Sequence, residues 1–391
     1  MHGVKFNNRY VVKMIKLLKK LIYSIIEKPV IYNVNNSNHS SWALVSYIKA
    51  PFIVRRRQKD THQNIWQVIE LAKILDNYGF NVDAVDYNLK KSVKFRHKYD
   101  LLIEIEPKDS PIYQDWLNPE CTKIAYMTGR NPLVSNSAEK NRLKYYTTRH
   151  GKNELHLKRQ AALLSGSVEE FDAFFLIGNE PTLDTYKMFD LPKKYLIPNT
   201  GYNFGVIPND NRRKNNFVFF SGYGVLHKGL DLLLDVFAQA DFPCKLFVCA
   251  NIDAEPDVKK EWDDILHNNK NIEYVGFLDI WSTKFLDIME QCCFSILPSC
   301  AEGIPGSVLT TMSAGVIPIC SKECSFSADE VILLDDCSIE CIKEKVLECS
   351  GMDEITIKNY QDRTKELVQG KYSCTNFVRS INAALDEILN N

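Results

Sequence analysis

Residues 292–320 have the sequence CCFSILPSCAEGIPGSVLTTMSAGVIPIC. The apolar run Phe294–Leu297 predicts a buried strand, and Ser307–Ala314 has a helical pattern. Val316–Ile319 predicts a second strand after that helix. Strand, loop, helix and strand in this order indicate a parallel sheet, with the loop at the carboxyl ends of its strands. Ligands of open α/β folds bind at that edge.

The loop between the first strand and the helix has a composition suited to an anionic sugar. Its single acid is Glu302, and Pro305 with Gly306 leads into the helix that Ser307 and Val308 continue. Backbone N–H groups at a helix N-terminus attract negative charge. A carboxylate beside them accepts hydrogen bonds from hydroxyl groups. Together they indicate a sugar attached to a phosphate.

These residues resemble the donor-site signature of retaining glycosyltransferases with the GT-B fold, of the family-4 type: P-S-x-x-E-G-x-P-x-S-V-L-x-x-M-x-x-G-x-x-P-I. The resemblance implies two Rossmann-like α/β domains facing a cleft, and it makes Glu302 the acid that contacts the donor sugar. It also assigns to the donor site Ser299, Gly303, Pro305, Gly306, Ser307, Val308 and Thr310. Thr310 stands where the family usually has a second acid that holds the ribose. An ordinary βα turn with a surface glutamate is the alternative.

A second part of the signature is SGYGVLHKG at residues 221–229. A glycine-rich turn from strand to helix lets a phosphate approach the backbone, which assigns Gly222, Tyr223 and Gly224 to the donor site. Lys228 near a helix start opposes the helix dipole, so its position indicates a bound anion rather than a solvated lysine. In the family, an arginine after the first glycine acts with the lysine on the diphosphate, and Tyr223 replaces it here.

The nucleotide base and the chemistry follow from the same resemblance. Ile272–Leu278 predicts a strand, and Phe277 and Leu278 are expected in the base pocket, with a plain core role as the alternative. The chain has no Asp-x-Asp motif, which metal-dependent transferases use. The resemblance therefore implies transfer with retention, no bound metal and no cofactor beyond the nucleotide sugar, with Glu302 and Lys228 as the catalytic candidates.

Residues 41–200 are expected to form an acceptor domain, and residues 201–373 the donor domain. Predicted strands of the first are Trp42–Ile48, Asn81–Tyr87, Tyr99–Glu106, Lys123–Met127, Phe171–Ile177 and Leu196–Asn199, with a helix over Ile65–Tyr78. The opening lacks the G-x-G-x-x-G fingerprint, which disfavours a Rossmann redox enzyme. Its motifs H-Q-N, Y-D, Y-x-T-G and G-N-E-x-T resemble acceptor domains of bacterial surface-polysaccharide members. This implies acceptor contacts from His62, Thr128, Gly129 and Arg130, although Arg130 also fits a surface position.

Three helical segments lie outside these motifs. Glu139, Arg142, Arg149 and Arg159 are expected on the polar face of a helix after residue 131. Residues 374–391 predict a helix that crosses back to the first domain. Residues 1–40 hold a basic amphipathic helix (9–28) and a linker. The helix predicts binding to a membrane surface, or packing against this protein or a partner subunit.

Composition restricts the class of protein. With 391 residues, 45% hydrophobic and 25% charged, the chain suits two ordinary globular domains, and its net charge of −1 gives no reason to expect nucleic acid as a partner. Twelve cysteines and no signal peptide indicate a reducing cytoplasm. Two C-x3-C pairs, from Cys320 to Cys341, resemble a zinc module, but buried thiols in a sheet explain them better.

We therefore expect a cytoplasmic enzyme, peripheral on the inner face of the plasma membrane. It would move a hexose-type sugar from a nucleotide-diphosphate sugar to a glycan or lipid-linked acceptor in lipopolysaccharide or capsule synthesis. The alternative is a non-catalytic GT-B module that binds sugar or nucleotide, or activates a transferase. Thr310 and Tyr223, two departures at polar contacts of the signature, motivate that alternative.

Overall fold

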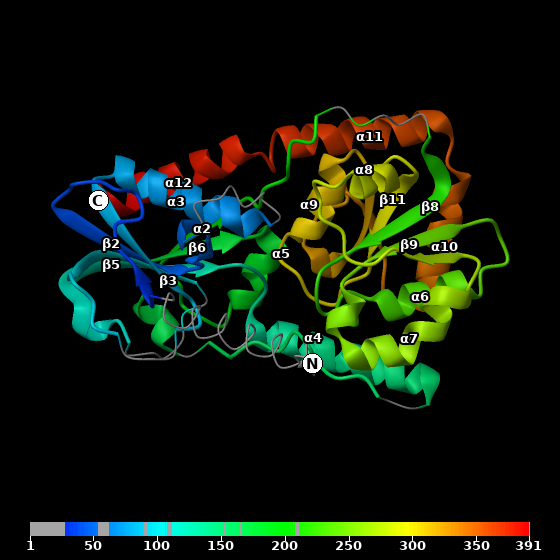
Figure 1. The fold of residues 1–391 in the computed structure, drawn as a ribbon, viewed down its shortest axis with the longest axis horizontal. Helices are drawn as coiled ribbons and strands as arrows, with labels where there is room; N and C mark the ends of the chain where they lie inside the picture. The colour runs from blue at the N-terminus through cyan, green and yellow to red at the C-terminus, as the bar shows by residue number, and fades with distance from the viewer. Residues whose placement is uncertain are drawn as a thin grey trace, which may run out of the picture.

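The computed structural model describes residues 28–53, 62–89, 93–105, 107, 112–151, 154–164, 166–205, 207 and 211–390. They form two α/β domains side by side (Figure 1). The predicted basic helix over 9–28 (apart from its last residue) and the arginines at 55–57 lie outside these residues. No helix in the described ranges combines the length and the apolar composition needed to cross a bilayer.

The first domain is built on a seven-stranded sheet in the order β1-β3-β2-β4-β5-β6-β7, parallel except for β1. Its strands are β1 Val30–Ile31, β2 Ser41–Tyr47, β3 Phe80–Asp86, β4 Tyr99–Ile105, β5 Leu117–Met127, β6 Ala173–Ile177 and β7 Lys193–Ile197. The helices are α2 Ala50–Ile53, α3 Gln63–Asn77, α4 Pro132–His150 and α5 Glu180–Leu183. Short apolar runs predicted β2, β3, β4, β6 and the end of β5, because strands of a covered parallel sheet are mostly apolar. They missed β1, which lies in the predicted linker, and the polar start of β7.

The second domain has a six-stranded parallel sheet in the order β10-β9-β8-β11-β12-β13. Its strands are β8 Arg213–Phe220, β9 Lys245–Cys249, β10 Ile272–Tyr274, β11 Cys292–Leu297, β12 Ile317–Ser321 and β13 Ile332–Leu334. Its helices are α6 Leu230–Ala238, α7 Pro256–Asn268, α8 Thr283–Met289, α9 Gly306–Ser313, α10 Ile339–Gly351 and α11 Glu354–Gln369. The strand expected over Ile272–Leu278 ends at Tyr274, ahead of Gly276 with its φ of 84°.

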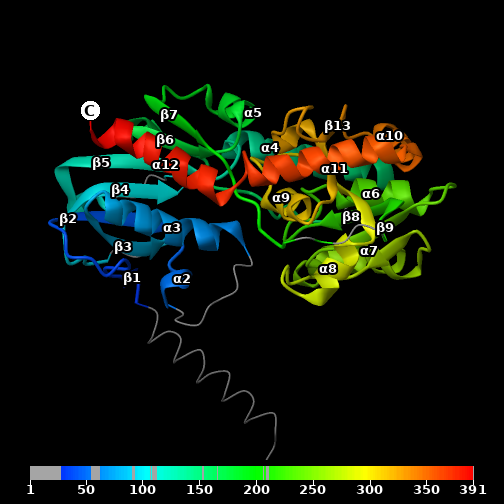
Figure 2. The same ribbon diagram turned by 90° about the horizontal axis from the view of Figure 1, so that it is seen from above.

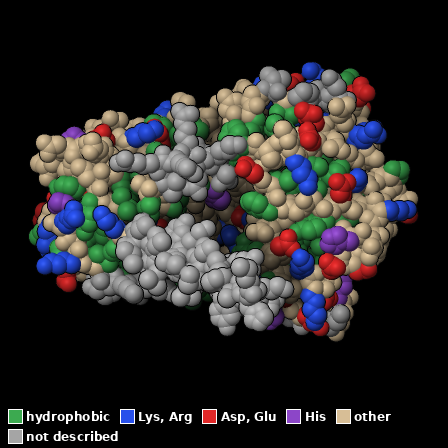
Figure 3. All heavy atoms as spheres, viewed as in Figure 1, with side chains coloured by type: hydrophobic (Ala, Val, Ile, Leu, Met, Phe, Trp, Pro, Cys, Tyr) green, Lys and Arg blue, Asp and Glu red, His purple; other side chains and the backbone are tan. Residues whose placement is uncertain are grey.

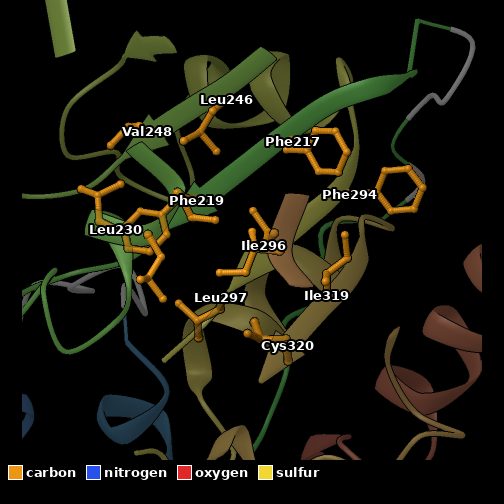
Figure 4. Close-up of a cluster of buried hydrophobic side chains, with 14 of the residues drawn as sticks. Phe217, Phe219, Leu230, Leu246, Val248, Phe294, Ile296, Leu297, Ile319 and Cys320 are labelled. Carbon is orange, nitrogen blue, oxygen red and sulfur yellow. The ribbon is translucent and has the colours of Figure 1, made fainter. Parts of the chain in front are cut away.

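The strand–loop–helix–strand prediction for residues 292–320 is confirmed. β11 pairs in parallel with β12, and α9 connects them. Figure 4 shows the buried side chains that join this unit to β8 and β9: Phe217, Phe219, Leu230, Leu246, Val248, Phe294, Ile296, Leu297, Ile319 and Cys320. Cys320 belongs to this core, and in the described part of the chain no three His, Cys, Asp or Glu side chains gather as a metal site.

Two of the places where the chain passes between the domains lie next to each other. The linker after β7 is one of them, and the turn from α11 into α12 (Cys374–Leu389) is the other. The N–H of Gly201 in the linker donates to the carbonyl of Tyr372 at 2.8 Å. Figure 2 shows α11 and α12 following one another across both domains. Phe377 and Ile381 of α12 are buried in the core of the first domain.

α4 departs from the predicted division, because its second half packs on the second domain (Figure 1). Tyr146 of α4 lies in the core that surrounds β8 and β9. Arg142 is 6% exposed, and its Nη1 lies 3.5 Å from Oδ1 of Asp231 on α6. Arg149 pairs with the other oxygen of Asp231 at 2.7 Å. Arg142 and Arg149 therefore face the second domain and pair with Asp231, and Arg159, expected on the same helix, lies beyond its end at His150.

Candidate active site

Lys228 and Glu302 meet at the carboxyl edge of the second sheet. Lys228 follows β8 and Glu302 follows β11, two neighbouring strands of that sheet. The Lys228 ammonium donates to Oε1 of Glu302 in a direct ion pair, and both side chains are 10% exposed. Figure 3 shows the molecule hollowed between its two lobes, with basic and histidine side chains in the hollow. The two residues predicted to carry the chemistry therefore form one unit.

The Glu302 carboxylate is strongly stabilised in its ionised form. Burial raises its pKa, but the charges of Lys228 and Arg159 oppose burial and lower the pKa to about 2. The hydroxyl of Ser299 also donates to Oε1 at 3.1 Å. A carboxylate with so low a pKa is a poor proton acceptor and a good hydrogen-bond acceptor. This favours contact with sugar hydroxyls over a role as general base.

His227, which the sequence did not single out, completes this unit. It is 1% exposed, and its Nε2 lies 2.6 Å from the carbonyl of Ala301 and 4.0 Å from Oε1 of Glu302. Burial lowers its pKa, and Lys228 lowers it further, against the opposing effect of Glu302. The neutral ring therefore donates from Nε2 to the Ala301 carbonyl. In the sequence, only its position directly before Lys228 indicated that His227 could belong to the site.

The glycine-rich turn differs in part from the expected phosphate site. The carboxylate of Glu255, which is fully buried, accepts the N–H groups of Gly224 at 2.7 Å and Val225 at 3.2 Å. The Gly224 amide is therefore already occupied, because a buried carboxylate needs donors. A Cβ at Gly222 would meet no atom within 4 Å, and Tyr223 is 44% exposed. These two residues remain open to a ligand.

Thr310 lies at the boundary between the two domains. It is 3% exposed, and its hydroxyl donates to the carbonyl of Gly306 at 2.8 Å. Gln63, the first residue of α3 in the other domain, donates from Nε2 to the same carbonyl at 2.8 Å and to Thr310 Oγ1 at 3.2 Å. The polar groups around this position are therefore paired within the protein.

The start of α9 is as predicted, with Pro305 in the N-cap position and Gly306 first in the helix. The N–H of Val308 donates to the carbonyl of Pro305 at 3.1 Å, so Val308 does not offer its amide to a ligand. The Ser307 hydroxyl is buried without a hydrogen-bond partner among the described residues. Ser307 is therefore the residue of this turn with an unused polar side-chain atom.

The two candidates for the base pocket, Phe277 and Leu278, differ in their exposure to solvent. Phe277 is 65% exposed beside the end of the second sheet, whereas Leu278 is 6% exposed. Leu278 belongs to a buried cluster with Phe247 and Phe285. The core role that was its alternative is therefore confirmed for Leu278, and Phe277 alone is free to stack on a base.

Three of the residues expected to bind the acceptor lie against the loop that holds Glu302. Arg130 donates from Nε to the carbonyl of Glu302 at 3.0 Å and from Nη2 to the carbonyl of Lys322 at 3.2 Å. A Cβ at Gly303 would lie 3.1 Å from Cα of Gly129 and 3.5 Å from the Thr128 carbonyl oxygen. Arg130 thus links the two domains here, and its contact with an acceptor stays a prediction.

His62, the fourth such residue, lies across the cleft from Lys228. Its Nδ1 accepts the N–H of Asn64 at 3.3 Å and caps α3. Desolvation by the surrounding protein lowers its pKa, and the charges of Lys228 and Arg159 lower it further. His62 is exposed and therefore accessible to a ligand.

Comparison with known proteins gives one family match and several structural neighbours. Residues 207–348 match the family model described as "Glycosyl transferases group 1". No curated protein sequence matches the chain. Sucrose-phosphate synthase from Thermosynechococcus elongatus superposes with a TM-score of 0.62 at 12% identity, covering 90% of this chain and 99% of that one. A glycosyltransferase from Rickettsia africae gives 0.56 at 12% identity, covering 90% and 100%.

TarM of Staphylococcus aureus is also similar, with a TM-score of 0.53 at 14% identity over 74% of this chain. This chain spans only 55% of the length of TarM. The fold is thus the GT-B fold of glycosyltransferases, as predicted from the sequence. The resemblance to group 1 glycosyl transferases is confirmed over the second domain, where Lys228 and Glu302 lie.

Proposed function

We propose that the protein is a glycosyltransferase that moves a hexose-type sugar from a nucleotide-diphosphate sugar to a glycan or lipid-linked acceptor, with retention and without a metal. The observation that carries the proposal is the Lys228–Glu302 pair at the carboxyl edge of the second sheet, facing the first domain. Support comes from structural neighbours described as complexes with such ligands. HepE of Anabaena was solved with UDP and glucose, and pneumococcal GtfA with UDP and GlcNAc.

The transfer reaction requires the negative charge that develops on the departing diphosphate to be neutralised. The bond between the donor sugar and the diphosphate breaks, and its electron pair leaves with the diphosphate. Lys228 would stabilise that charge, together with backbone N–H groups at the start of α9, in positions fixed before the reaction. Glu302 holds the Lys228 ammonium in place and accepts hydrogen bonds from donor hydroxyls.

A proton must also leave the acceptor hydroxyl as its oxygen bonds to the sugar. The Glu302 carboxylate, with a pKa of about 2, is too weak a base for this step. A phosphate oxygen, whose second pKa is about 6, is the better acceptor for that proton. We assign Glu302 to binding and orientation of the donor, and the proton to the departing diphosphate.

The acceptor class is proposed from the motifs of the first domain. Their resemblance to surface-polysaccharide enzymes indicates a lipopolysaccharide or capsule intermediate on the inner face of the plasma membrane. TarM was solved with fondaparinux, alpha-GlcNAc-glycerol and UDP, so a related fold handles glycan-type ligands. His62 is our candidate for the acceptor contact, because it is exposed and the charge of Lys228 acts on it.

The test is transfer and slow hydrolysis with a panel of radiolabelled nucleotide sugars. Wild type should release the nucleoside diphosphate from at least one donor. Lys228→Ala and Glu302→Gln should lower kcat/KM by about 10²–10³, the usual effect of losing a group that stabilises transition-state charge. Equal activity of wild type and both variants would refute the assignment of these residues.

A non-catalytic GT-B module is the second candidate, and two observations favour it. Thr310 and the Gly224 amide, both expected to meet the donor, are bonded inside the protein. A thermal-shift series with nucleoside diphosphates separates the candidates, because a ligand that binds only the folded state raises the melting temperature. Absence of any shift across the bases would favour the non-catalytic module.

A further inference from the structure

Arg159 lies in the irregular segment 154–164 that follows α4. Glu139 of α4, a fully buried acid, anchors this segment. Its carboxylate accepts the backbone N–H groups of Lys158 at 2.9 Å and Arg159 at 3.0 Å, and the side-chain amide of Gln160 at 2.7 Å. A buried carboxylate with this many donors fixes the groups around it. The backbone position of Arg159 is therefore set by the fold.

The same segment is attached to the second domain. Asp257 in the first turn of α7 accepts the ammonium of Lys158 at 2.7 Å and the backbone N–H of His156 at 2.9 Å. Burial raises the pKa of Asp257, but these hydrogen bonds outweigh burial and lower it to about 2. The segment thus joins α4 to the second domain close to the glycine-rich turn.

The Arg159 side chain lies directly over that turn. A Cβ at Gly224 would meet Cγ of Arg159 at 2.5 Å and Cδ at 2.7 Å, and the φ of Gly224 is 84°. Glycine is therefore required at this position for its conformation and for the passage of the arginine. Burial raises the pKa of Glu302, while the charges of Lys228 and then Arg159 lower it. The Arg159 charge therefore acts on the same cleft as the Lys228–Glu302 pair.

The Arg159 guanidinium has no direct ion-pair partner among the described residues, although its charge acts on Glu302. Lys228 is paired with Glu302, and Arg130 donates to carbonyl groups. The Arg159 side chain is exposed and makes no hydrogen bond or ion pair with any other described residue. The carboxylates nearest the turn are already used, since Glu255 and Glu139 accept backbone N–H groups and Asp257 accepts Lys158. The Arg159 guanidinium is therefore the cation beside the turn that can pair with an anionic ligand.

We propose that Arg159, from the segment anchored to the first domain, binds the diphosphate of the nucleotide sugar together with Lys228. This assignment rests on the proposed function and deepens it, because it supplies the second cation of the donor site. The family-type arginine would come from within the turn, at the position of Tyr223. Here the charge reaches the turn from outside, over Gly224. Donor binding then depends on the 154–164 segment remaining seated on the second domain.

The experiment measures nucleotide affinity by calorimetry. A panel of nucleoside diphosphates and the matching monophosphates is titrated into wild type, Arg159→Ala, Arg159→Lys and Lys228→Ala. A charge-assisted contact to phosphate predicts a loss of about 10- to 100-fold in diphosphate affinity for Arg159→Ala and for Lys228→Ala. The monophosphate should lose less, and Arg159→Lys should lie between. Arg379→Ala, an exposed arginine of α12, is the matched control and should bind as wild type does.

A rescue variant separates this role from a structural one. Tyr223 is 44% exposed, so Tyr223→Arg adds a cation to the turn without disturbing the core. In the Arg159→Ala background it should restore diphosphate affinity to within about threefold of wild type, a difference of only about 0.65 kcal/mol. A loss that Tyr223→Arg does not restore, with a lowered melting temperature, would show that Arg159 only supports the fold and would overturn the proposal.

The remaining outcomes are also decisive. If Lys228→Ala loses affinity and Arg159→Ala does not, the proposed function stands and the Arg159 assignment fails. The Arg159 assignment also fails if Arg159→Ala changes only the KM for the acceptor. If wild type binds no nucleoside diphosphate, both the proposed function and this assignment fail.

Discussion

Gln63 Nε2 lies 3.2 Å from Thr310 Oγ1, although the two residues belong to opposite domains. The same amide donates to the carbonyl of Gly306, the first residue of α9. A Cβ at Gly306 would meet Gln63 Oε1 at 2.5 Å, so glycine is required for this close contact. The start of α3 and the start of α9 are thus in direct contact across the domain boundary.

Replacing Gln63 by alanine should weaken that contact. Two hydrogen bonds are lost, each with a net worth of about 0.5–1.5 kcal/mol, so urea unfolding should show a loss of about 1–3 kcal/mol. Thr310 keeps its own bond to Gly306, which limits the effect. Gln239→Ala, at an exposed position after α6, should change stability by less than about 0.5 kcal/mol. Equal effects of the two variants would contradict a Gln63 contact between the domains.

Asp231 should be among the most sensitive charged positions. It is fully buried between the guanidinium groups of Arg142 and Arg149. Asp231→Ala would leave those cations without their main partner, at a cost of about 3–5 kcal/mol, measurable by denaturant unfolding. Asp241, an exposed acid, provides the control, and its change to alanine should be nearly neutral. A small loss of stability in Asp231→Ala would mean that the guanidinium groups of Arg142 and Arg149 can reach solvent in the variant.

His227 predicts a stability that falls with acidity. Its pKa in the fold is lowered from 6.5, so the unfolded state binds the proton more readily. The stabilisation is therefore complete above about pH 6.5 and declines as the pH falls toward the folded value, by at most about 1.4 kcal/mol per pH unit. His227→Gln should flatten the profile of unfolding free energy between about pH 7.5 and 5.5. The exposed His267→Gln should leave its slope unchanged.

Phe277 and Leu278 should respond oppositely. Phe277→Ala removes an exposed ring, so stability should hold while nucleotide affinity falls by the roughly 1–3 kcal/mol of one base–aromatic stack. Leu278→Ala opens a cavity in the core and should cost about 2–5 kcal/mol of unfolding free energy. For both variants, calorimetry measures the nucleotide affinity and urea unfolding measures the free energy of unfolding. A destabilised Phe277→Ala with normal nucleotide affinity would remove Phe277 from the base site.

The sequence predicted what depends on local pattern. Apolar runs predicted most of the strands. The Glu302 loop was placed at the correct edge of the sheet because the strand, loop and helix around it follow one another in the sequence. The contacts at Thr310, Gly224 and Arg142 were not predictable in this way. Each depends on a partner far along the chain: Gln63, Glu255 and Asp231. A charged side chain on a helix gives the same pattern whether it meets water or a buried partner.

The hydrogen bond between Gly201 and Tyr372 ties the linker after β7 to the turn from α11 into α12. Two backbone segments held side by side can act as a hinge, so we expect the lobes to rotate about an axis that passes near them. Such a rotation moves atoms least near the axis and most at the mouth of the hollow. Small changes in backbone torsion at residues 199–205 and 370–373 would therefore control the access of a large substrate and the exit of its product.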